Sequence, residues 1–321
     1  MTHWLLIIAS LAWIDPGPSM IAGVPAQADA PARHETKDHL STDRMEALVA
    51  GPMARVRSGD VAGGQRAFET LLEDTSRRHG TGSAEAADLL MSFGVLIYTE
   101  GLIPSTGSEA DDGLRASSLP YLRRSVEAYR RAFGPDHPLV AVALHSFGQA
   151  MVDLSPDDPP AEAEASLDEA YRIRLAALGP ANPETLAALV NVADIRALPV
   201  RTGRDRARVA AVAAMYRQGL AQARRPMGAF PEEQPRFWYA RLARLYVRNG
   251  QAAASLQVIR EAERSSGDWA CVDMSLLVAE IADLLGQHGF ATEAEALRPR
   301  DHFDRAMECL DRQDDPVIAT R

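Results

Sequence analysis

Four arginines lie close together near the middle of the chain, and their side chains could bind an anion. They are Arg201, Arg204, Arg206 and Arg208. Guanidinium groups match carboxylates and phosphates in geometry, so this stretch could bind an acidic partner or a phosphate. Charge runs are more often hydrated loops that bind nothing. Both interpretations stay open, and the stretch is a candidate loop patch.

The common catalytic and cofactor motifs do not occur in the sequence. H-E-x-x-H, C-x-x-C, the P-loop and the nucleophile elbow are all absent. None of the eight histidines is spaced four residues from another His or a Cys. Asp157 and Asp158 lie in a Pro-rich segment that offers no rigid geometry for acid–base catalysis. We therefore expect no catalytic residue, no cofactor, no metal, and a chain that is not an enzyme.

The two cysteines, Cys271 and Cys309, leave two interpretations open. In an oxidising compartment they could form a disulfide. Their separation in sequence says nothing about the distance between their Cα atoms. We favour two unpaired thiols.

The amino-acid composition indicates whether helices or strands carry these candidate residues. Hydrophobic residues make up 46% of the chain, aromatic residues only 6%, and alanine is abundant. Small apolar residues at helical spacing favour closely packed helices. Strictly alternating runs of β-branched residues, which would indicate strands, are not evident. We therefore expect an all-α fold.

An internal repeat is the strongest signal in the sequence. Helical runs end at three similar glycines, Gly80, Gly134 and Gly179. Glycine ends helices because it adopts positive φ at little cost. Three residues after each glycine stands a residue suited to an N-cap, namely Ser83, His137 and Asn182, and Pro138 and Pro183 follow at the first helical position.

Each new helix then shows the same spacing of large and small residues. A large apolar residue is followed three positions later by a second one, and then by Gly or Ala. The first large residues are Leu90, Leu144, Leu189, Tyr239 and Val278, and the small ones are Gly94, Gly148, Ala193, Ala243 and Ala282. A small residue at this position lets the backbone of a partner helix approach closely.

This pattern resembles the tetratricopeptide repeat, W-x2-L-G-x2-Y followed by A-x3-F and P. The turns Gly134–Pro138 and Gly179–Pro183 resemble those of the kinesin-light-chain type. The resemblance implies an α-solenoid of helix-turn-helix units over residues 46–298, with five clear units and a degenerate first one. The helical spacing of Phe303, Ala306, Met307 and Leu310 predicts a capping helix and tail over residues 299–321, with a frayed tail as the alternative.

The resemblance also implies where a partner binds. In this family the first helices of successive units line a groove, and their positions not used for packing contact ligands. Mapped onto this chain, these positions give Ser92, His145, Ser146, Gln149, Asn191, Asp194, Arg241 and Arg244. Taken singly, each is more often a solvated surface residue, and only the group as a whole predicts a groove. Inserted segments at 102–118, 154–161 and 198–207 are a second candidate surface.

The N-terminus has the pattern of an export signal. An apolar run from Trp4 to Ile14 is too short for a confident membrane span. Ala26-Gln27-Ala28 then forms a plausible cleavage site. We expect a signal peptide at 1–28, a flexible segment at 29–45, no membrane span after cleavage, and a periplasmic or secreted protein.

Three functions are compatible with these patterns. The first is an exported scaffold that binds a protein or peptide partner through the groove or the inserted loops. The second is an enzyme or accessory subunit acting on a cell-envelope polymer, and the third is a cytoplasmic helical regulator with a misassigned start. The net charge of −10 argues against nucleic-acid binding. The sequence leaves the oligomeric state open.

Overall fold

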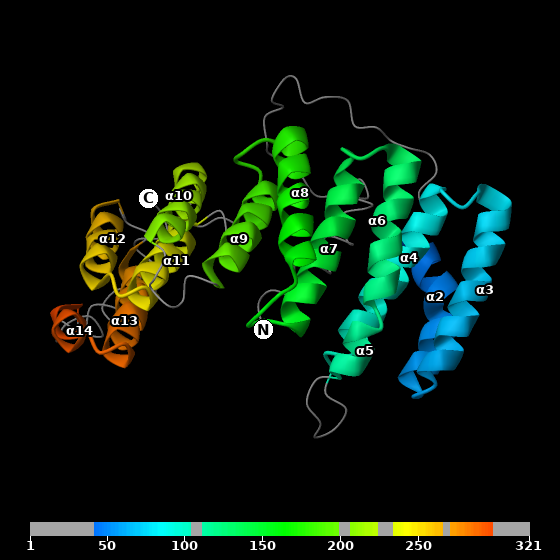
Figure 1. Ribbon diagram of the computed structural model, residues 1–321, viewed down its shortest axis with the longest axis horizontal. Coiled ribbons are helices and arrows are strands. Elements are labelled where there is room, and N and C mark those ends of the chain that lie inside the picture. Colours follow the sequence, from blue (N-terminus) through cyan, green and yellow to red (C-terminus); the bar gives the residue numbers. More distant parts are fainter. Residues whose placement is uncertain (1–41, 104–110, 199–205, 224–233, 266–269, 298–321) are drawn as a thin grey trace, which may run out of the picture. The chain divides into compact units, whose positions relative to one another are not determined.

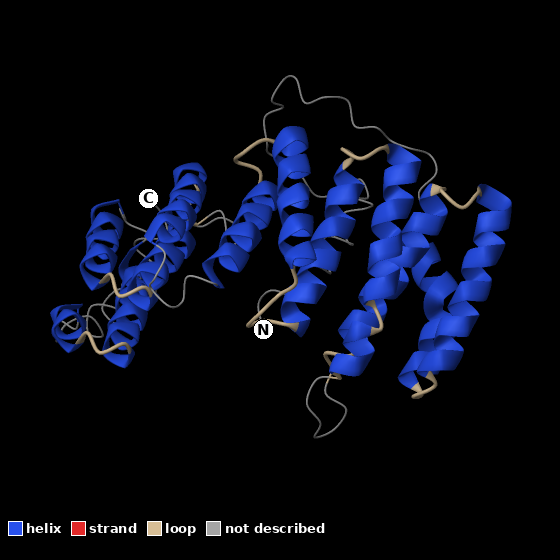
Figure 2. Ribbon diagram, in the orientation of Figure 1, coloured by secondary structure: helices blue, strands red, loops and turns tan. Residues whose placement is uncertain are grey.

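The computed structural model describes residues 42–103, 111–198, 206–223, 234–265 and 270–297, without the side chains of residues 42, 43, 270–273, 275 and 276. The regular structure in these ranges is entirely helical (Figures 1 and 2). The chain forms two compact units, Met1–Ile173 and Arg174–Arg321. Among the described helices, none is both long and apolar enough to cross a lipid bilayer.

The first unit is built from helices that pack against their neighbours in the sequence. Contacts join α2 to α3, α4 to α6 and α6 to α7, and a further contact joins α2 to α4. The helices are α2 (Thr42–Arg57), α3 (Val61–His79), α4 (Ala84–Glu100), α5 (Asp112–Ala116), α6 (Leu119–Phe133), α7 (Pro138–Leu154) and α8 (Ala161–Leu178), which runs past Ile173.

The second unit repeats this arrangement. Helices α9 and α10, α11 and α12, and α13 and α14 pack as pairs, and α11 also contacts α13. Their bounds are α9 (Pro183–Ala197), α10 (Arg206–Gln222), α11 (Pro235–Arg248), α12 (Ala252–Ser265), α13 (Ala270–Gln287) and α14 (Ala291–Leu297). Helical hairpins stacked in chain order are the predicted all-α helical-repeat fold, which is therefore confirmed.

The glycine-centred turns form as the sequence predicted. Ser83 accepts a hydrogen bond from the amide of Ala86, and Asn182 accepts one from Glu184. His137 caps α7 through its ring Nδ1, which accepts from the amide of Leu139. Gly134 has φ 89° and ψ 163°, a backbone region that is essentially restricted to glycine.

Close packing within a hairpin depends on the predicted small residues. A Cβ atom added to Gly94 would lie 2.9 Å from Cδ2 and 3.2 Å from the backbone N of Leu122. Helices α4 and α6 therefore touch backbone to side chain at this point. At the corresponding positions of the second unit, Ala193, Ala243 and Ala282 are fully buried.

Aromatic side chains fill the core where successive hairpins meet. In the first unit, the rings of Phe68 and Phe93 stack with centroids 4.0 Å apart, and Tyr121 meets Phe93 edge-on at 5.0 Å. These three side chains come from α3, α4 and α6. In the second unit, the fully buried Trp238 of α11 packs over Gly219 of α10.

Several predicted features lie outside the described residues. They are the signal peptide at 1–28, the flexible segment as far as residue 41, the C-terminal segment 299–321, Arg201, Arg204, Cys309 and the side chain of Cys271.

Candidate functional site

The inserted segment at 102–118 contains a short helix that the sequence did not predict. Helix α5 begins after Asp111, whose carboxylate accepts a hydrogen bond from the amide of Leu114. It ends at Ser117, and the hydroxyl of Ser118 donates to the carbonyl of Arg115. The insertion is thus an ordered part of the first unit where the structure describes it.

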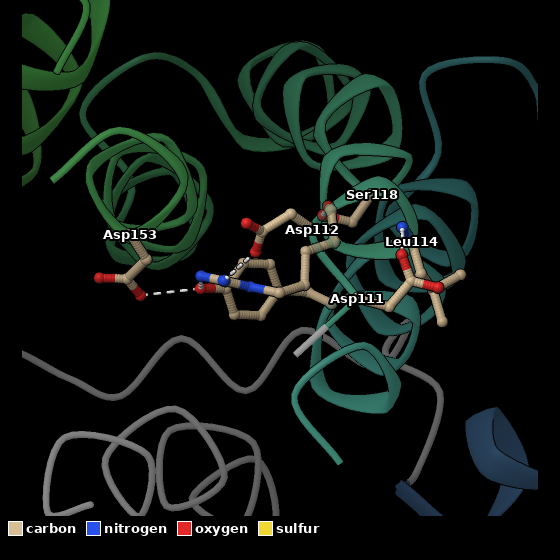
Figure 3. Close-up of polar contacts among 7 residues, drawn as sticks. Asp111, Asp112, Leu114, Ser118 and Asp153 are labelled. Carbon is tan, nitrogen blue, oxygen red and sulfur yellow. Dashed lines mark hydrogen bonds and ion pairs between the residues drawn. The ribbon is translucent and has the colours of Figure 1, made fainter. Parts of the chain in front are cut away.

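A polar network ties α5 to both neighbouring helices. The buried Arg115 donates from Nη2 to the hydroxyl of Tyr98 on α4 at 3.0 Å, and from Nη1 to Asp112 at 2.6 Å. Tyr98 in turn donates to Oδ2 of Asp153 on α7 at 2.8 Å. Figure 3 shows Asp112 and Asp153 converging on this network from α5 and α7.

This network stabilises the packing of α4, α5 and α7. Burial, reinforced by the charge of Asp153, raises the pKa of the Tyr98 hydroxyl above its usual value. Its phenol therefore remains protonated and serves as both acceptor and donor. Gln149, one of the predicted groove residues, donates to Oδ1 of Asp153 at 2.8 Å and extends the same network.

The other predicted groove residues of the first unit differ in exposure. Ser92 is buried and its hydroxyl donates to the sulfur of Met45 on α2 at 3.3 Å. Ser146 is buried as well, while His145 is half-buried. The two serines are therefore not accessible to a partner in this structure.

In the second unit, the predicted residues come together around one carboxylate. Asp194 on α9 accepts a 2.6 Å hydrogen bond from the hydroxyl of Tyr216 on α10. It also accepts from Nε of Arg241 on α11 at 3.2 Å. The Arg241 guanidinium lies 3.7 Å from the ring centroid of Phe237, so this arginine is held on both sides. Burial, together with the charge of Asp194, raises the pKa of Tyr216 well above its usual value.

Two further arginines of α11 follow on the same helix face. Arg244 forms an ion pair with Glu280 of α13, and this hydrogen bond raises the pKa of Arg244. Arg248 is exposed and makes no hydrogen bond or ion pair with any residue that the structure describes. The spacing of Arg241, Arg244 and Arg248 is i, i+3, i+7, which places all three side chains on one side of α11.

These side chains surround a cavity of about 290 Å³, which we name the arginine cavity. That volume is near the lower end for ligand pockets in proteins. The cavity is lined by Asp194, Ala197, Leu198, Tyr216, Arg241, Arg244, Leu245, Arg248 and Asn249.

The lining of the arginine cavity carries a net positive charge and contains a hydrogen-bond acceptor, Oδ1 of Asn249, that has no donor among the described residues. Three guanidinium groups face one carboxylate, in a chain whose net charge is −10. Asn249 is buried, and its Nδ2 donates to the carbonyl of Leu245 at 2.8 Å. Its Oδ1 is buried and has no hydrogen-bond partner among the described residues. The site can therefore accept an anion together with a hydrogen-bond donor.

Only part of this site was predictable from the sequence. Asp194, Arg241 and Arg244 were predicted, and the structure brings them together, whereas Asn191 is half-buried and outside the lining. Arg248 was missed although its helical spacing from Arg244 signals a shared face. No sequence signal marks the amide oxygen of Asn249 as buried and unpaired.

The two described arginines of the candidate loop patch, Arg206 and Arg208, have different surroundings. Nε of Arg208 donates to the carbonyl of Arg196 at 3.1 Å, near the end of α9. Arg206 is exposed and lines a second cavity of about 370 Å³ with Val209, Ala210, Tyr246 and Gln251. Among the described residues, no group of three His, Cys, Asp or Glu side chains could hold a metal ion.

Comparison with known proteins agrees with the repeat pattern. Residues 109–139, which contain α5, α6 and the turn into α7, match the family model of the tetratricopeptide repeat. This match confirms the resemblance that the glycine-centred turns predicted. No curated protein matches the sequence.

Two solved structures similar to this chain are both described as nearly identical TPR-like repeats of a putative kinesin light chain from Podosopora anserina. The first, a substituted variant of those repeats, is 17% identical with a TM-score of 0.49, and the match covers 71% of this chain and 98% of that one. The second is 16% identical with a TM-score of 0.47, and the match covers 70% and 97%.

Proposed function

We propose that this tetratricopeptide-repeat chain is a scaffold that binds a protein partner at the arginine cavity of its second unit. Helical-repeat folds typically bind partners over surfaces made by successive repeats. The observation that carries the proposal is the convergence of Asp194, Arg241 and Arg244 from two first helices, α9 and α11, on one cavity.

The charge of the arginine cavity favours an acidic segment of the partner. Asp194 already neutralises Arg241, and Glu280 partly neutralises Arg244, but Arg248 adds an uncompensated positive charge. A local positive potential on a chain with net charge −10 attracts carboxylates selectively. Because this surface is small, other contacts on the second unit add to the affinity.

Capture of the native partner by matched variants tests this proposal. Arg244→Ala with Arg248→Ala removes two cavity arginines four positions apart. Arg260→Ala with Arg264→Ala removes two exposed arginines at the same spacing on α12 and serves as the control. We expect the cavity variant to lose at least about tenfold in captured partner, because each charged hydrogen bond contributes about 1.5–3 kcal/mol. Equal capture by both variants would show that the partner binds elsewhere.

We also propose that the chain acts outside the cytoplasm, after removal of residues 1–28. The apolar run Trp4–Ile14 and the Ala26-Gln27-Ala28 pattern support this location. Mass spectrometry of the protein from its native cells should find an N-terminus at Asp29. An intact N-terminus in the cytoplasmic fraction would instead support a cytoplasmic regulator.

A further inference from the structure

One arginine of the arginine cavity forms an ion pair with a carboxylate that is not part of the cavity lining. Glu280 of α13 forms an ion pair with Arg244, and the two side chains are 42% and 37% exposed. Arg248, one helical turn further along α11, lines the same cavity and has no such partner among the described residues. Arg244 is therefore paired with a carboxylate of the protein itself, whereas Arg248 has no carboxylate partner among the described residues.

We propose that Glu280 is an internal competitor for the partner, and that an acidic residue of the partner displaces it from Arg244 and binds between Arg244 and Arg248. This inference rests on the proposed function and adds the ligand's chemistry and its regulation. Glu280 lowers the affinity of the cavity for any carboxylate, so only a segment that makes further contacts remains bound.

The solvent exposure of the Arg244–Glu280 ion pair lets an incoming carboxylate replace Glu280. An ion pair between exposed side chains contributes little to stability, because water solvates both partners well. An incoming carboxylate would contact two guanidinium groups, whereas Glu280 has an ion pair with Arg244. Arg241 takes no part in the exchange, because Asp194 and the ring of Phe237 already hold it.

The unpaired amide oxygen of Asn249 further restricts the kind of ligand that the cavity can bind. This Oδ1 atom is buried, lines the same cavity and needs a hydrogen-bond donor. A glutamate or aspartate within a peptide carries a main-chain N–H beside its carboxylate, and so supplies both groups. Inorganic sulfate, which is fully ionised at neutral pH, offers charge without any hydrogen-bond donor, so the cavity should prefer an acidic peptide to sulfate.

Binding of a labelled peptide to the full chain tests the proposal. The probe is a hexaglutamate peptide with blocked ends and a fluorescent label, and hexaglutamine is the uncharged control. Glu280→Gln removes the competitor. Glu261→Gln is the matched control, because Glu261 pairs with Arg217 at 3.0 Å between α10 and α12.

We expect Glu280→Gln to strengthen hexaglutamate binding by about threefold to fivefold, the range that corresponds to loss of an exposed ion pair. Glu261→Gln should leave it unchanged within about 1.5-fold, since the two substitutions alter the net charge equally. Arg248→Gln should weaken binding by at least about tenfold, since it removes a charged contact. Inorganic sulfate should compete poorly at equal concentration.

Each other result would contradict a defined part of the proposal. If Arg248→Gln weakens binding while Glu280→Gln leaves it unchanged, Glu280 is not a competitor, although the cavity still binds the partner. Equal strengthening by Glu261→Gln would assign the effect to net charge alone. Hexaglutamate binding no tighter than hexaglutamine would refute the acidic ligand, whereas the proposed function stands or falls on capture of the native partner.

Discussion

The hydroxyl of Tyr98 donates a 2.8 Å hydrogen bond to Asp153, and this contact joins α4 of one hairpin to α7 of the next. The same hydroxyl accepts from Arg115 of the inserted helix α5. One phenol oxygen therefore connects three helices, and two of them are first helices of successive repeats. The packing of this part of the first unit depends on a polar group as well as on apolar contacts.

Removal of that hydroxyl should destabilise the first unit. Tyr98→Phe leaves Arg115 and Asp153 without one of their partners, and an unpaired buried polar group costs about 1–3 kcal/mol. Chemical denaturation followed by circular dichroism measures the loss. Tyr121→Phe is the control, because the Tyr121 hydroxyl makes no hydrogen bond with any described residue. Equal effects of the two substitutions would mean that the network contributes nothing.

Three tyrosines should make the protein sensitive to alkali. Burial, together with a nearby carboxylate, raises the pKa of Tyr98, Tyr129 and Tyr216 above the ordinary value of about 10. The unfolded chain therefore loses these protons at lower pH than the folded chain does. The stability that this difference represents is complete below about pH 10 and falls as the pH rises toward the folded-state pKa values.

The fall should reach about 1.4 kcal/mol per pH unit for each of these tyrosines. Thermal unfolding measured at several pH values between about 8 and 11 detects it. Ultraviolet absorbance of tyrosinate gives an independent reading, since the chain has seven tyrosines and the buried ones should ionise only on unfolding. Titration of all seven near pH 10 in a folded protein would contradict the expected shifts.

Two glycines within helices should respond in opposite directions to replacement by alanine. At Gly94, a Cβ atom would lie 2.9 Å from the side chain of Leu122, and relieving such overpacking costs about 1–3 kcal/mol. At Gly286 of α13, nothing lies within 4 Å of an added Cβ. Gly286→Ala should therefore gain part of the helix propensity of alanine, up to about 0.5 kcal/mol near a helix end. The denaturation midpoints of the two variants and the parent protein measure both effects. A stabilising Gly94→Ala would show that α4 and α6 separate easily.

Local features of the fold were predictable because neighbours in sequence determine them. Ser83 and Asn182 are helix caps because each needs only an amide two or three residues away. Gly134 ends its helix because no other residue takes its backbone angles without strain. Helices and turns followed from these signals.

Side-chain environments could not be predicted in the same way, because they depend on helices distant in sequence. Ser92 and Asp194 were both assigned to the ligand-contacting face, yet Ser92 is buried against Met45 while Asp194 lines the arginine cavity. The network of Tyr98 and Arg115 was missed because α5 folds only against two other helices. The repeat pattern identifies helix positions, and the residues packed around each position decide its exposure.

Site-specific photocrosslinking in native cells tests the partner-binding role of the arginine cavity most directly. A photoreactive amino acid placed at Leu198, which lines the cavity, reports on it without removing an arginine, and the same group at Arg260 reports on an exposed site of α12. We expect position 198 to form a crosslink that maps to an acidic segment of one protein partner and that Arg244→Ala weakens. Position 260 should not form it. A partner crosslinked equally at both positions, or at 260 alone, would contradict the assignment of this cavity as the binding site.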